Sequence, residues 1–385
     1  MISILDSKSN KNKCQKFTPT DIVESMLDIA DYKNALAGKK VLENSFGSGN
    51  IVIAIVKRYI EDSISAGILP EAISCGLKND IYGVELDKEL FDTCIHKLNL
   101  MVKAYSIPEV EWSLYNEDAL FWECPITFDF IIGNPPYIRL QNLSIEYRDF
   151  IKNNFVSATG RFDIFTCFLE KSDKLLNENG RMCLITSNKY LTANYGVGIR
   201  EYLSQTGHVR KLVDLYDTKF FGAAVLPAII MCENGKCDNC EVDYIGIKTA
   251  EQNGQYECLN ANELFEYVEN ELTCGKRFVH YGNEDKQVFE VSRSKVKIPD
   301  NGKTWNFSTS DENTIKTKMD EQKLCSLADI FDVCVGIKTT ADTVFVKPMT
   351  KNFIDEHAFE DITVYPLIQS FNVNKWNISW GNNSK

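Results

Sequence analysis

Several features common in exported and membrane proteins are missing from this sequence. No apolar run approaches the roughly 20 residues that a membrane-spanning helix needs. The first residues, MISILDSKSNKNKC, have neither the apolar core nor the cleavage pattern of a secretory signal. We therefore expect a cytoplasmic protein whose 13 cysteines are reduced and serve mainly as small apolar core residues.

Positive charge is also scarce. The chain has 42 Lys and Arg against 54 Asp and Glu, a formal net charge of -12. Sequence-independent binding to nucleic acid depends on cations that neutralise phosphates, so this balance argues mildly against a large nonspecific DNA-binding surface. It leaves room for a local basic cleft. Nucleic-acid binding therefore has to be inferred from a site.

The segment from about Lys39 to Cys232 alternates short apolar runs with longer amphipathic stretches. This alternation predicts an α/β fold with an open, doubly wound and mostly parallel sheet. One helix is predicted over 163–176, where apolar residues recur at helical spacing before the stop signal NENG. The predicted strands are KKVLEN, DIYGVEL, EWSLYN, FDFIIG, RMCLITS, RKLVDLYD and PAIIMCE.

The length of 385 residues favours two domains over one. Beyond about Gly235 turn-rich segments separate short β-like runs, and the strand-helix alternation stops. We expect a catalytic domain over residues 1–249 and a second domain over 250–385. The ending WNISWGNNSK does not resemble a natural terminus, so the second domain is expected to be incomplete.

The stretch VLENSFGSGNIVIAIVKRYI has the strand, glycine turn and helix order of a nucleotide-binding loop. Gly47 and Gly49 would let the backbone approach a ligand and present N–H groups at a helix N-terminus. The dinucleotide fingerprint G-x-G-x-x-G is absent, because Val52 stands three positions after Gly49. A glycine loop alone is weak evidence.

Acidic residues follow the next two predicted strands. Glu85 and Asp87 end IYGVELD, where a carboxylate can accept two hydrogen bonds from a ribose diol. Asp118 in NEDAL has the matching position for an adenine amino group. Each acid alone is more often a solvated surface residue. The ordered set predicts a cofactor built from adenosine and an amino acid.

The stretch FDFIIGNPPYIRL ends an apolar strand with a rigid polar segment. Pro135 and Pro136 fix the backbone after Asn134, so the Asn134 side-chain oxygen and the Pro135 carbonyl can converge on one planar amino group. Tyr137 adds an aromatic face on which a base can stack, worth ~1 to 3 kcal/mol. An amine held in this way becomes a better nucleophile toward a methyl sulfonium, and the displacement needs mainly positioning. Standing alone, NPPY is equally well interpreted as a tight turn.

In content and order these motifs resemble the γ-class adenine-N6 DNA methyltransferases of bacterial restriction-modification systems, including the methylase domains of fused type II enzymes. The resemblance implies a Rossmann-like S-adenosylmethionine-dependent methyltransferase sheet followed by a target-recognition domain. The matching segments are FTPTDIVESML, VLENSFGSGN, GVELD, NEDALFW, FIIGNPPYIRL, the stretch from GRFDIF to GIREYL, DTKFFGAAVLPAIIMC and VCVGIKTTADTVFV.

For the cofactor, the resemblance implies that Thr18 and Glu43 face the methionine end of S-adenosylmethionine and that Glu85 holds the ribose. Asp118 and the backbone N–H of Ala119 would hold the adenine, with an aromatic residue packed beside it. The complete implied cofactor set is Thr18, Glu43, Gly47, Gly49, Glu85, Asp118, Ala119 and Phe168. No metal is implied.

For the substrate, the resemblance implies N6 of an adenine flipped out of duplex DNA, at a cost of a few kcal/mol. The implied catalytic residues are Asn134, Pro135, Pro136, Tyr137 and Phe221. Phe221 would pack against the target base, and the adjacent Phe220 is the alternative for this role. In the second domain Gly336, Lys338 and Thr339 are candidate DNA contacts, and a purely structural loop is an equal alternative. A cognate restriction endonuclease or further subunit is a candidate partner.

The sequence departs from the family pattern in the glycine loop. The usual D/E-P-x-C-G-x-G reads Glu43-Asn44-Ser45-Phe46-Gly47-Ser48-Gly49, so Asn44 replaces proline and Phe46 replaces cysteine. The acid and both glycines remain, and we expect the cofactor still to bind.

Elsewhere in the chain, the spacing of Cys232, Cys237 and Cys240 suggests a zinc site. A structural zinc site needs four ligands, so a hairpin turn is the favoured reading of this cluster.

Other functions stay open. N-P-P-Y also resembles the motif of enzymes that methylate a glutamine amide in release factors, and an RNA methyltransferase could use the same clamp. The order of the motifs and the long extension after them favour DNA. A non-catalytic, methylase-like DNA-binding subunit is a different class, against which the intact NPPY argues. The leader before the first motif is too short for a nuclease, which could instead lie beyond Lys385 or on a partner chain.

Overall fold

The structure is a computed structural model. It describes residues 18–218, 226–235, 241–250, 258–259, 261–270, 272, 275–281 and 287–307, a few residues between 315 and 330, and two short strands, β12 (Val373–Asn374) and β13 (Asn377–Ile378). The chain divides into two compact units, Met1–Thr317 and Lys318–Lys385. In the second unit β12 and β13 pair with each other. All that follows concerns the first unit.

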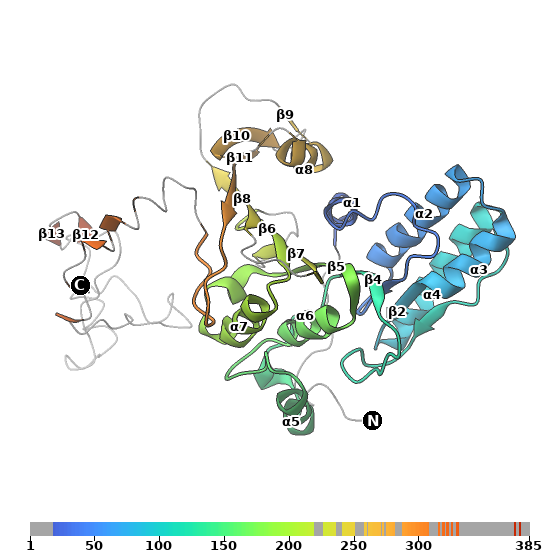
Figure 1. Cartoon of the computed structure of the whole chain (residues 1–385), viewed down its shortest axis with the longest axis horizontal. Coiled ribbons are helices and arrows are strands. Elements are labelled where there is room, and N and C mark those ends of the chain that lie inside the picture. Colours follow the sequence, from blue (N-terminus) through green and yellow to red (C-terminus); the bar gives the residue numbers. More distant parts are fainter. Residues whose placement is uncertain are drawn as a thin grey trace, which may run out of the picture. The chain divides into compact units, whose positions relative to one another are not determined.

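One half of the central sheet is parallel (Figure 1). Its strand order β3-β2-β1-β4-β5 puts the carboxyl ends of successive strands along one edge. The strands are β1 (Val41–Glu43), β2 (Ile81–Val84), β3 (Ser113–Tyr115), β4 (Phe128–Gly133) and β5 (Leu176–Ser187). All of them lie where apolar runs predicted strands, and the α/β class is confirmed.

Two more predicted strands, β6 (Val209–Asp214) and β7 (Pro227–Glu233), continue this sheet, with β7 antiparallel to both β5 and β6. The sheet then extends through β8 (Val242–Ala250), β11 (Gln287–Val296), β10 (Gly275–Tyr281) and β9 (Cys258–Leu259). The full order is β3-β2-β1-β4-β5-β7-β6-β8-β11-β10-β9. The division at residues 249 and 250 remains a prediction about function, whereas the sheet itself continues across it.

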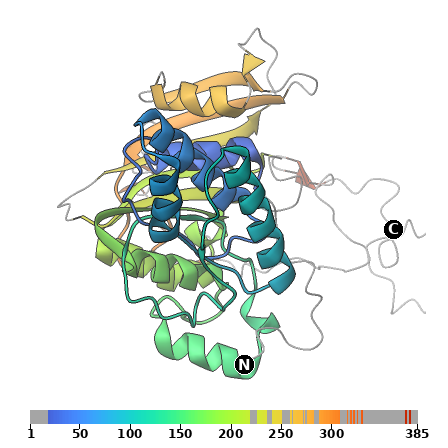
Figure 2. The same ribbon diagram turned by 90° about the vertical axis from the view of Figure 1, so that its right-hand side faces the viewer.

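Helices connect and cover the strands. The connecting helices are α2 (Asn50–Ser65), α3 (Pro70–Asp80), α4 (Lys88–Ala104), α5 (Ile145–Asn154), α6 (Phe165–Lys174), α7 (Val197–Thr206) and α8 (Ala261–Asn270), with short 3-10 turns at Leu140–Asn142, Asn188–Leu191 and Asn194–Gly196. In both ribbon views α5 stands apart from the sheet layers (Figures 1 and 2). None of the helices in the described part of the chain has the length and apolarity to cross a bilayer.

The helix predicted over 163–176 is shorter than expected. It runs from Phe165 to Lys174, and Leu176 already pairs with Phe128 of β4. The NENG segment at 177–180 therefore lies inside the residues of β5, and its Asn179 has a φ of 62°. The helix thus ends two residues before its predicted end, and NENG is not its stop, because strand pairing already begins at Leu176.

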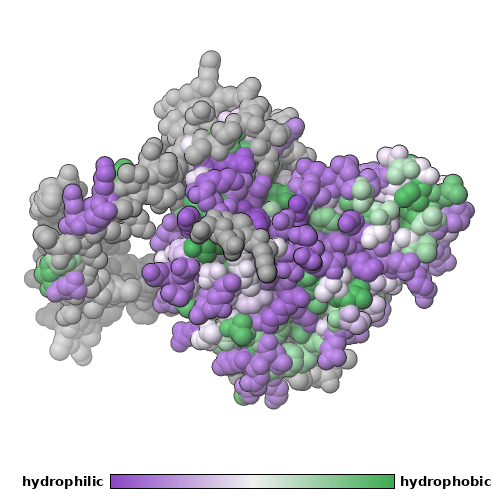
Figure 3. Space-filling view, in the orientation of Figure 1, coloured by the Kyte–Doolittle hydropathy of each residue, from purple (hydrophilic) through white to green (hydrophobic). Residues whose placement is uncertain are grey.

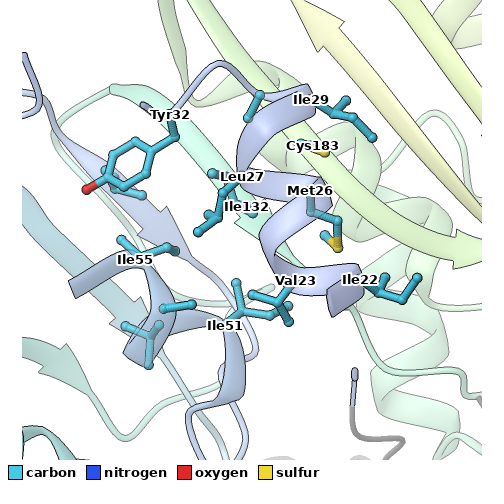
Figure 4. Close-up of a cluster of buried hydrophobic side chains, with 14 of the residues drawn as sticks. Ile22, Val23, Met26, Leu27, Ile29, Tyr32, Ile51, Ile55, Ile132 and Cys183 are labelled. Atoms are coloured by element: carbon cyan, nitrogen blue, oxygen red, sulfur yellow. The ribbon is translucent and has the colours of Figure 1, made fainter. Parts of the chain in front are cut away.

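The N-terminal helix α1 (Thr20–Ile29) closes one side of the core. Its apolar residues recur at helical spacing and pack against α2 and the strands below (Figure 4). Hydrophilic residues predominate on the described surface of the face seen in Figure 3. Side chains labelled in the α1 cluster are Ile22, Val23, Met26, Leu27, Ile29, Tyr32, Ile51, Ile55, Ile132 and Cys183, all buried.

Candidate active site

The glycine loop leaves β1 at the centre of the parallel edge and enters α2. Gly47 has a φ of 55° and Gly49 a φ of 99°, a region that L side chains rarely adopt. A Cβ atom on Gly49 would stand 2.7 Å from the Cys94 sulfur. Asn44, which replaces the family's proline, donates from Nδ2 to the Ser172 Oγ on α6 at 2.8 Å. The loop thus keeps both glycines and gains a contact that proline could not make.

Glu85 joins the end of β2 to this loop. Its Oε2 accepts from the Gly47 N–H at 2.8 Å and its Oε1 from the Asp87 N–H at 2.8 Å. Burial raises the pKa of Glu85, and the backbone N–H groups act against that rise. A carboxylate has about four lone-pair positions. Each Glu85 oxygen can therefore accept one further bond from a ligand hydroxyl.

Glu43, the last residue of β1, is a buried acid with an unsatisfied oxygen. Its side chain is 2% exposed, and its Oε2 has no hydrogen-bond partner among the described residues. Burial, and then the nearby charge of Glu85, raise the pKa of Glu43 well above its ordinary value. Such a carboxylate is costly unless a cation pairs with it. S-adenosylmethionine carries an ammonium and a sulfonium, so its charges fit this position.

Asp118 follows β3 and is held by two helices. Its Oδ1 accepts from the Leu120 N–H at 2.9 Å and from the Tyr147 hydroxyl of α5 at 3.3 Å. Lys171 of α6 donates to the carbonyls of Leu120 at 3.1 Å and Trp122 at 2.6 Å. Burial raises the pKa of Asp118 and lowers the pKa of Lys171 to about 8. The turn is thereby fixed at the edge of the sheet.

Beside Asp118, Ala119 and Phe168 are both buried, 7% and 5% exposed, in the same hydrophobic cluster. Phe168 comes from α6, which also supplies the lysine that holds the Asp118 turn. An apolar wall and a backbone N–H next to a carboxylate suit the flat face and amino edge of an adenine ring. Ala119 follows Asp118 in the chain, and Phe168 belongs to the same hydrophobic cluster as Ala119.

Asn134 follows β4 and forms hydrogen bonds through both its side-chain amide and its main-chain carbonyl. Its Nδ2 donates to the Thr18 Oγ1 at 3.0 Å, its Oδ1 accepts from the Tyr137 hydroxyl at 3.0 Å, and its main-chain carbonyl accepts from the Ser45 hydroxyl at 3.1 Å. The Tyr137 hydroxyl also lies 3.3 Å from the Ile185 carbonyl. The oxygen that was predicted to accept from an amino group thus accepts from Tyr137 in this structure.

Hydrogen bonds link Thr18, Asn134 and Tyr137 to one another, and Gly47 to Glu85. Thr18, buried before α1, accepts from Asn50 of α2 through its carbonyl at 3.2 Å and from Asn134 through its hydroxyl. Pro135 is buried, Pro136 is half-buried, and the described residues contain no cis peptide bond. Phe221 lies outside the described residues, as do Gly336, Lys338 and Thr339.

Of the cysteine cluster, Cys232 is buried on β7, and Cys237 and Cys240 lie outside the described residues. Within the described ranges no group of His, Cys, Asp and Glu has an arrangement that could hold a metal ion.

Several residues that hold the site were missed in the sequence. Ser45, Tyr147 and Lys171 make the contacts described above, and Asn116 donates from Nδ2 to the Glu85 carbonyl at 2.8 Å. Asp163, in the quoted GRFDIF, is half-buried, its buried Oδ1 has no hydrogen-bond partner among the described residues, and burial raises its pKa to about 6. The only sequence signal for Ser45 and Asn116 is that they are polar residues close to the ends of predicted strands. Nothing local in the sequence distinguishes Tyr147 or Lys171.

Comparisons with known proteins agree with this geometry. Residues 79–221 match the family described as Eco57I restriction-modification methylase. The Type II methyltransferase M.BanIII of Aneurinibacillus aneurinilyticus is 28% identical over 383 residues, covering 94% of this chain and 62% of that protein. The Type II methyltransferase M.BstVI of Geobacillus stearothermophilus is 32% identical over 242 residues, covering 59% of this chain and 43% of that protein.

Among solved structures, DrdV in its complex with DNA aligns with a TM-score of 0.55 and 15% identity, over 89% of this chain and 37% of that chain. This likeness shows the fold alone. The chain spans 62% of the length of M.BanIII and 43% of that of M.BstVI. Taken together, the family match and the relatives support a methyltransferase of a restriction-modification system.

Proposed function

We propose that this chain carries the catalytic part of a site-specific DNA methyltransferase that transfers a methyl group from S-adenosylmethionine to N6 of adenine in duplex DNA. The observation that carries the proposal is the position of Asn134. Its amide contacts Thr18 of the first motif and its carbonyl contacts Ser45 of the glycine loop. The NPPY segment therefore lies directly against the loop that is proposed to hold the methyl donor.

The residues around the loop suit each part of that cofactor. The unpartnered oxygen of Glu43 would pair with its ammonium, the remaining lone pairs of Glu85 with its ribose hydroxyls, and Asp118 with its adenine amino group. When bound, the cofactor supplies a methyl group on a sulfonium, which needs no further activation.

Asn134 would hold the substrate amine. Thr18 fixes the orientation of the amide by accepting from Nδ2, so Oδ1 must face the opposite way. A target amino group would take the place of the Tyr137 hydroxyl on Oδ1, and the Tyr137 ring would then be free to lie against the base. Catalytic hydrogen bonds often form only in the complex with substrate. The proton lost from N6 leaves to solvent after transfer.

An adenine inside a duplex exposes no path for in-line attack on N6, so the nucleotide has to leave the stack. We assign target recognition to residues 250–385, in line with the length of the chain beyond the NPPY segment. A restriction endonuclease, on this or another chain, would act on the same sequence in an unmodified state. Such a system operates in the cytoplasm, where the DNA is.

The test is methyl transfer from labelled cofactor to unmethylated bacterial DNA, with release-factor protein and RNA as parallel substrates. Asn134→Ala should lower the transfer rate at least about 100-fold while the cofactor dissociation constant changes less than about threefold, because the amide acts on the transferring step. Long-read sequencing of the product should report N6-methyladenine in one sequence context. Methylation of protein or RNA in place of DNA would refute the proposed substrate.

A further inference from the structure

Two arginines beside the NPPY segment differ from the others. Wherever the structure describes an arginine side chain, it shows a hydrogen bond or an ion pair, except at Arg139 and Arg161. Arg58, Arg181 and Arg293 form ion pairs with carboxylates. Arg148, Arg200 and Arg210 donate to main-chain carbonyls. Arg139 and Arg161 are exposed, and no such contact is found for either within the described part.

These two arginines lie on adjacent segments. Arg139 and Asp163 form an antiparallel bridge, flanked by hydrogen bonds from the Leu140 N–H to the Phe162 carbonyl at 3.2 Å and from the Ile164 N–H to the Ile138 carbonyl at 2.9 Å. The segment that leaves NPPY thus runs beside the segment that enters α6. Arg161 stands two residues before the partner of Arg139.

The pairing also relates the arginines to Tyr137. Alternate residues of an extended segment face the same way, so Arg139 shares a face with Tyr137, two residues earlier. Tyr137 and Phe165 stand two residues from Arg139 and Asp163 on the two segments, and their ring centroids lie 6.0 Å apart. Ile138 and Phe162 point into the core and are 8% and 3% exposed. Arg139 and Arg161 themselves are exposed, and Arg139 stands two residues after Tyr137, the residue proposed to lie against the base.

The charges of the chain make this placement unusual. The net charge is -12, and several cations elsewhere in the described part form ion pairs, as in the contacts of Asp243 with Arg293, Lys211 and Lys295. Arg139 and Arg161 are exposed on adjacent segments and can together attract an anion with several oxygens, although the charge of Arg139 also acts on Asp163, whose pKa it lowers against the effect of burial. Guanidinium suits phosphate because its planar N–H groups can bind two oxygens at once.

We propose that Arg139 and Arg161 form a phosphate-binding rim that grips the DNA backbone next to the flipped nucleotide. This inference rests on the proposed function, and it assigns to the catalytic domain a part of the DNA contact. Phosphate contacts carry no sequence information but set the register of the duplex, so the rim would bring a backbone step to Tyr137 whatever the recognition sequence is.

The test uses the full chain and a fluorescein-labelled random-sequence duplex, with affinity measured by anisotropy over a series of salt concentrations. Arg139→Ala and Arg161→Ala should each weaken binding roughly 5- to 10-fold at low salt and lower the slope of log affinity against log salt by about 0.9, one phosphate each. The double variant should lose about 1.8 from the slope. Arg→Lys at either position should keep most of the slope, since the charge remains.

The control is Lys103→Ala, which removes an exposed cation in the last turn of α4. It should leave affinity and slope unchanged, and all variants should keep the thermal midpoint and the cofactor affinity of the original chain. If the double variant keeps the original slope while the original chain binds DNA, the rim is refuted, whether or not methylation occurs. If the original chain binds DNA and loses slope in the variants but methylates no DNA, the rim stands and the proposed function fails. If it binds no DNA, both fail.

Discussion

Glu43→Gln should change stability and cofactor binding in opposite directions. In the structure the Glu43 carboxylate is buried at the end of β1 with one oxygen unpartnered and Glu85 close by. Gln has nearly the same shape and no charge. It can still accept from the Val52 N–H, which bonds to Glu43 in the structure. The substitution removes the charge and replaces one carboxylate oxygen by an amide NH2 group of similar size.

The magnitude follows from the cost of a buried polar group without a partner, about 1–3 kcal/mol and more for a charge. Glu43→Gln should stabilise the cofactor-free protein by about that amount, which raises the thermal midpoint by roughly 2 °C per kcal/mol. Because folding raises the pKa of Glu43, its contribution to stability is present at low pH and is lost as pH rises through the folded pKa. The advantage of Gln should accordingly grow as pH rises above the ordinary carboxyl pKa of 4.5.

Cofactor affinity should fall, since a hydrogen bond to a charged group contributes about 1.5–3 kcal/mol, or roughly 10- to 150-fold in the dissociation constant. Thermal melts without cofactor and titration calorimetry with S-adenosylmethionine measure the two effects. Glu71→Gln, at an exposed position in the first turn of α3, is the control and should change stability by less than about 0.5 kcal/mol. A Glu43→Gln protein that melts lower at pH 8, or that binds cofactor as well as the original, would contradict this reasoning.

Two further predictions concern the packing behind the NPPY segment. Burial raises the pKa of Asp163 from 3.8 to about 6, so the stability it contributes below pH 4, at most roughly 3 kcal/mol, should disappear by about pH 7. Melts of Asp163→Asn should lack this dependence, and profiles parallel to the original would contradict it. Trp305 is 2% exposed, and its Nε1 has no hydrogen-bond partner among the described residues. Trp305→Ala should cost about 3–5 kcal/mol in denaturant titrations and Trp305→Phe much less, whereas equal losses would show that the Nε1 matters.

Much of the catalytic half of the fold was predictable from local pattern. Apolar runs of strand length gave the positions of β1 to β7, and the polar residues at their carboxyl ends gave the candidate site. This works because a buried parallel strand must be apolar along its length and can turn polar only where it reaches the edge. The strands beyond Gly235 were not recognised as part of the same sheet. β8 pairs with β11, about forty residues later, and such long-range pairing leaves no local signal.

The site shows the same division between local and long-range information. Asn134, Pro135 and Tyr137 stand together in the chain, so their rigidity could be inferred from two prolines. Their partners could not: Thr18 lies 116 residues before Asn134, and only the packing of α1 brings the two together. The hydrogen bond from Tyr137 to the Asn134 oxygen was also unexpected. It depends on the rotamer that the surrounding core permits.

By itself, the sequence determined which residues could do chemistry, because glycine, proline and strand-end acids act through their own backbone limits and charges. Tertiary structure decided which of them are satisfied and which are not. Within the described residues the Glu43 Oε2 has no hydrogen-bond partner, and the exposed Arg139 and Arg161 beside the NPPY segment form no hydrogen bond or ion pair through their side chains. Whether a charged group has a partner depends on three-dimensional packing and cannot be predicted from the local sequence.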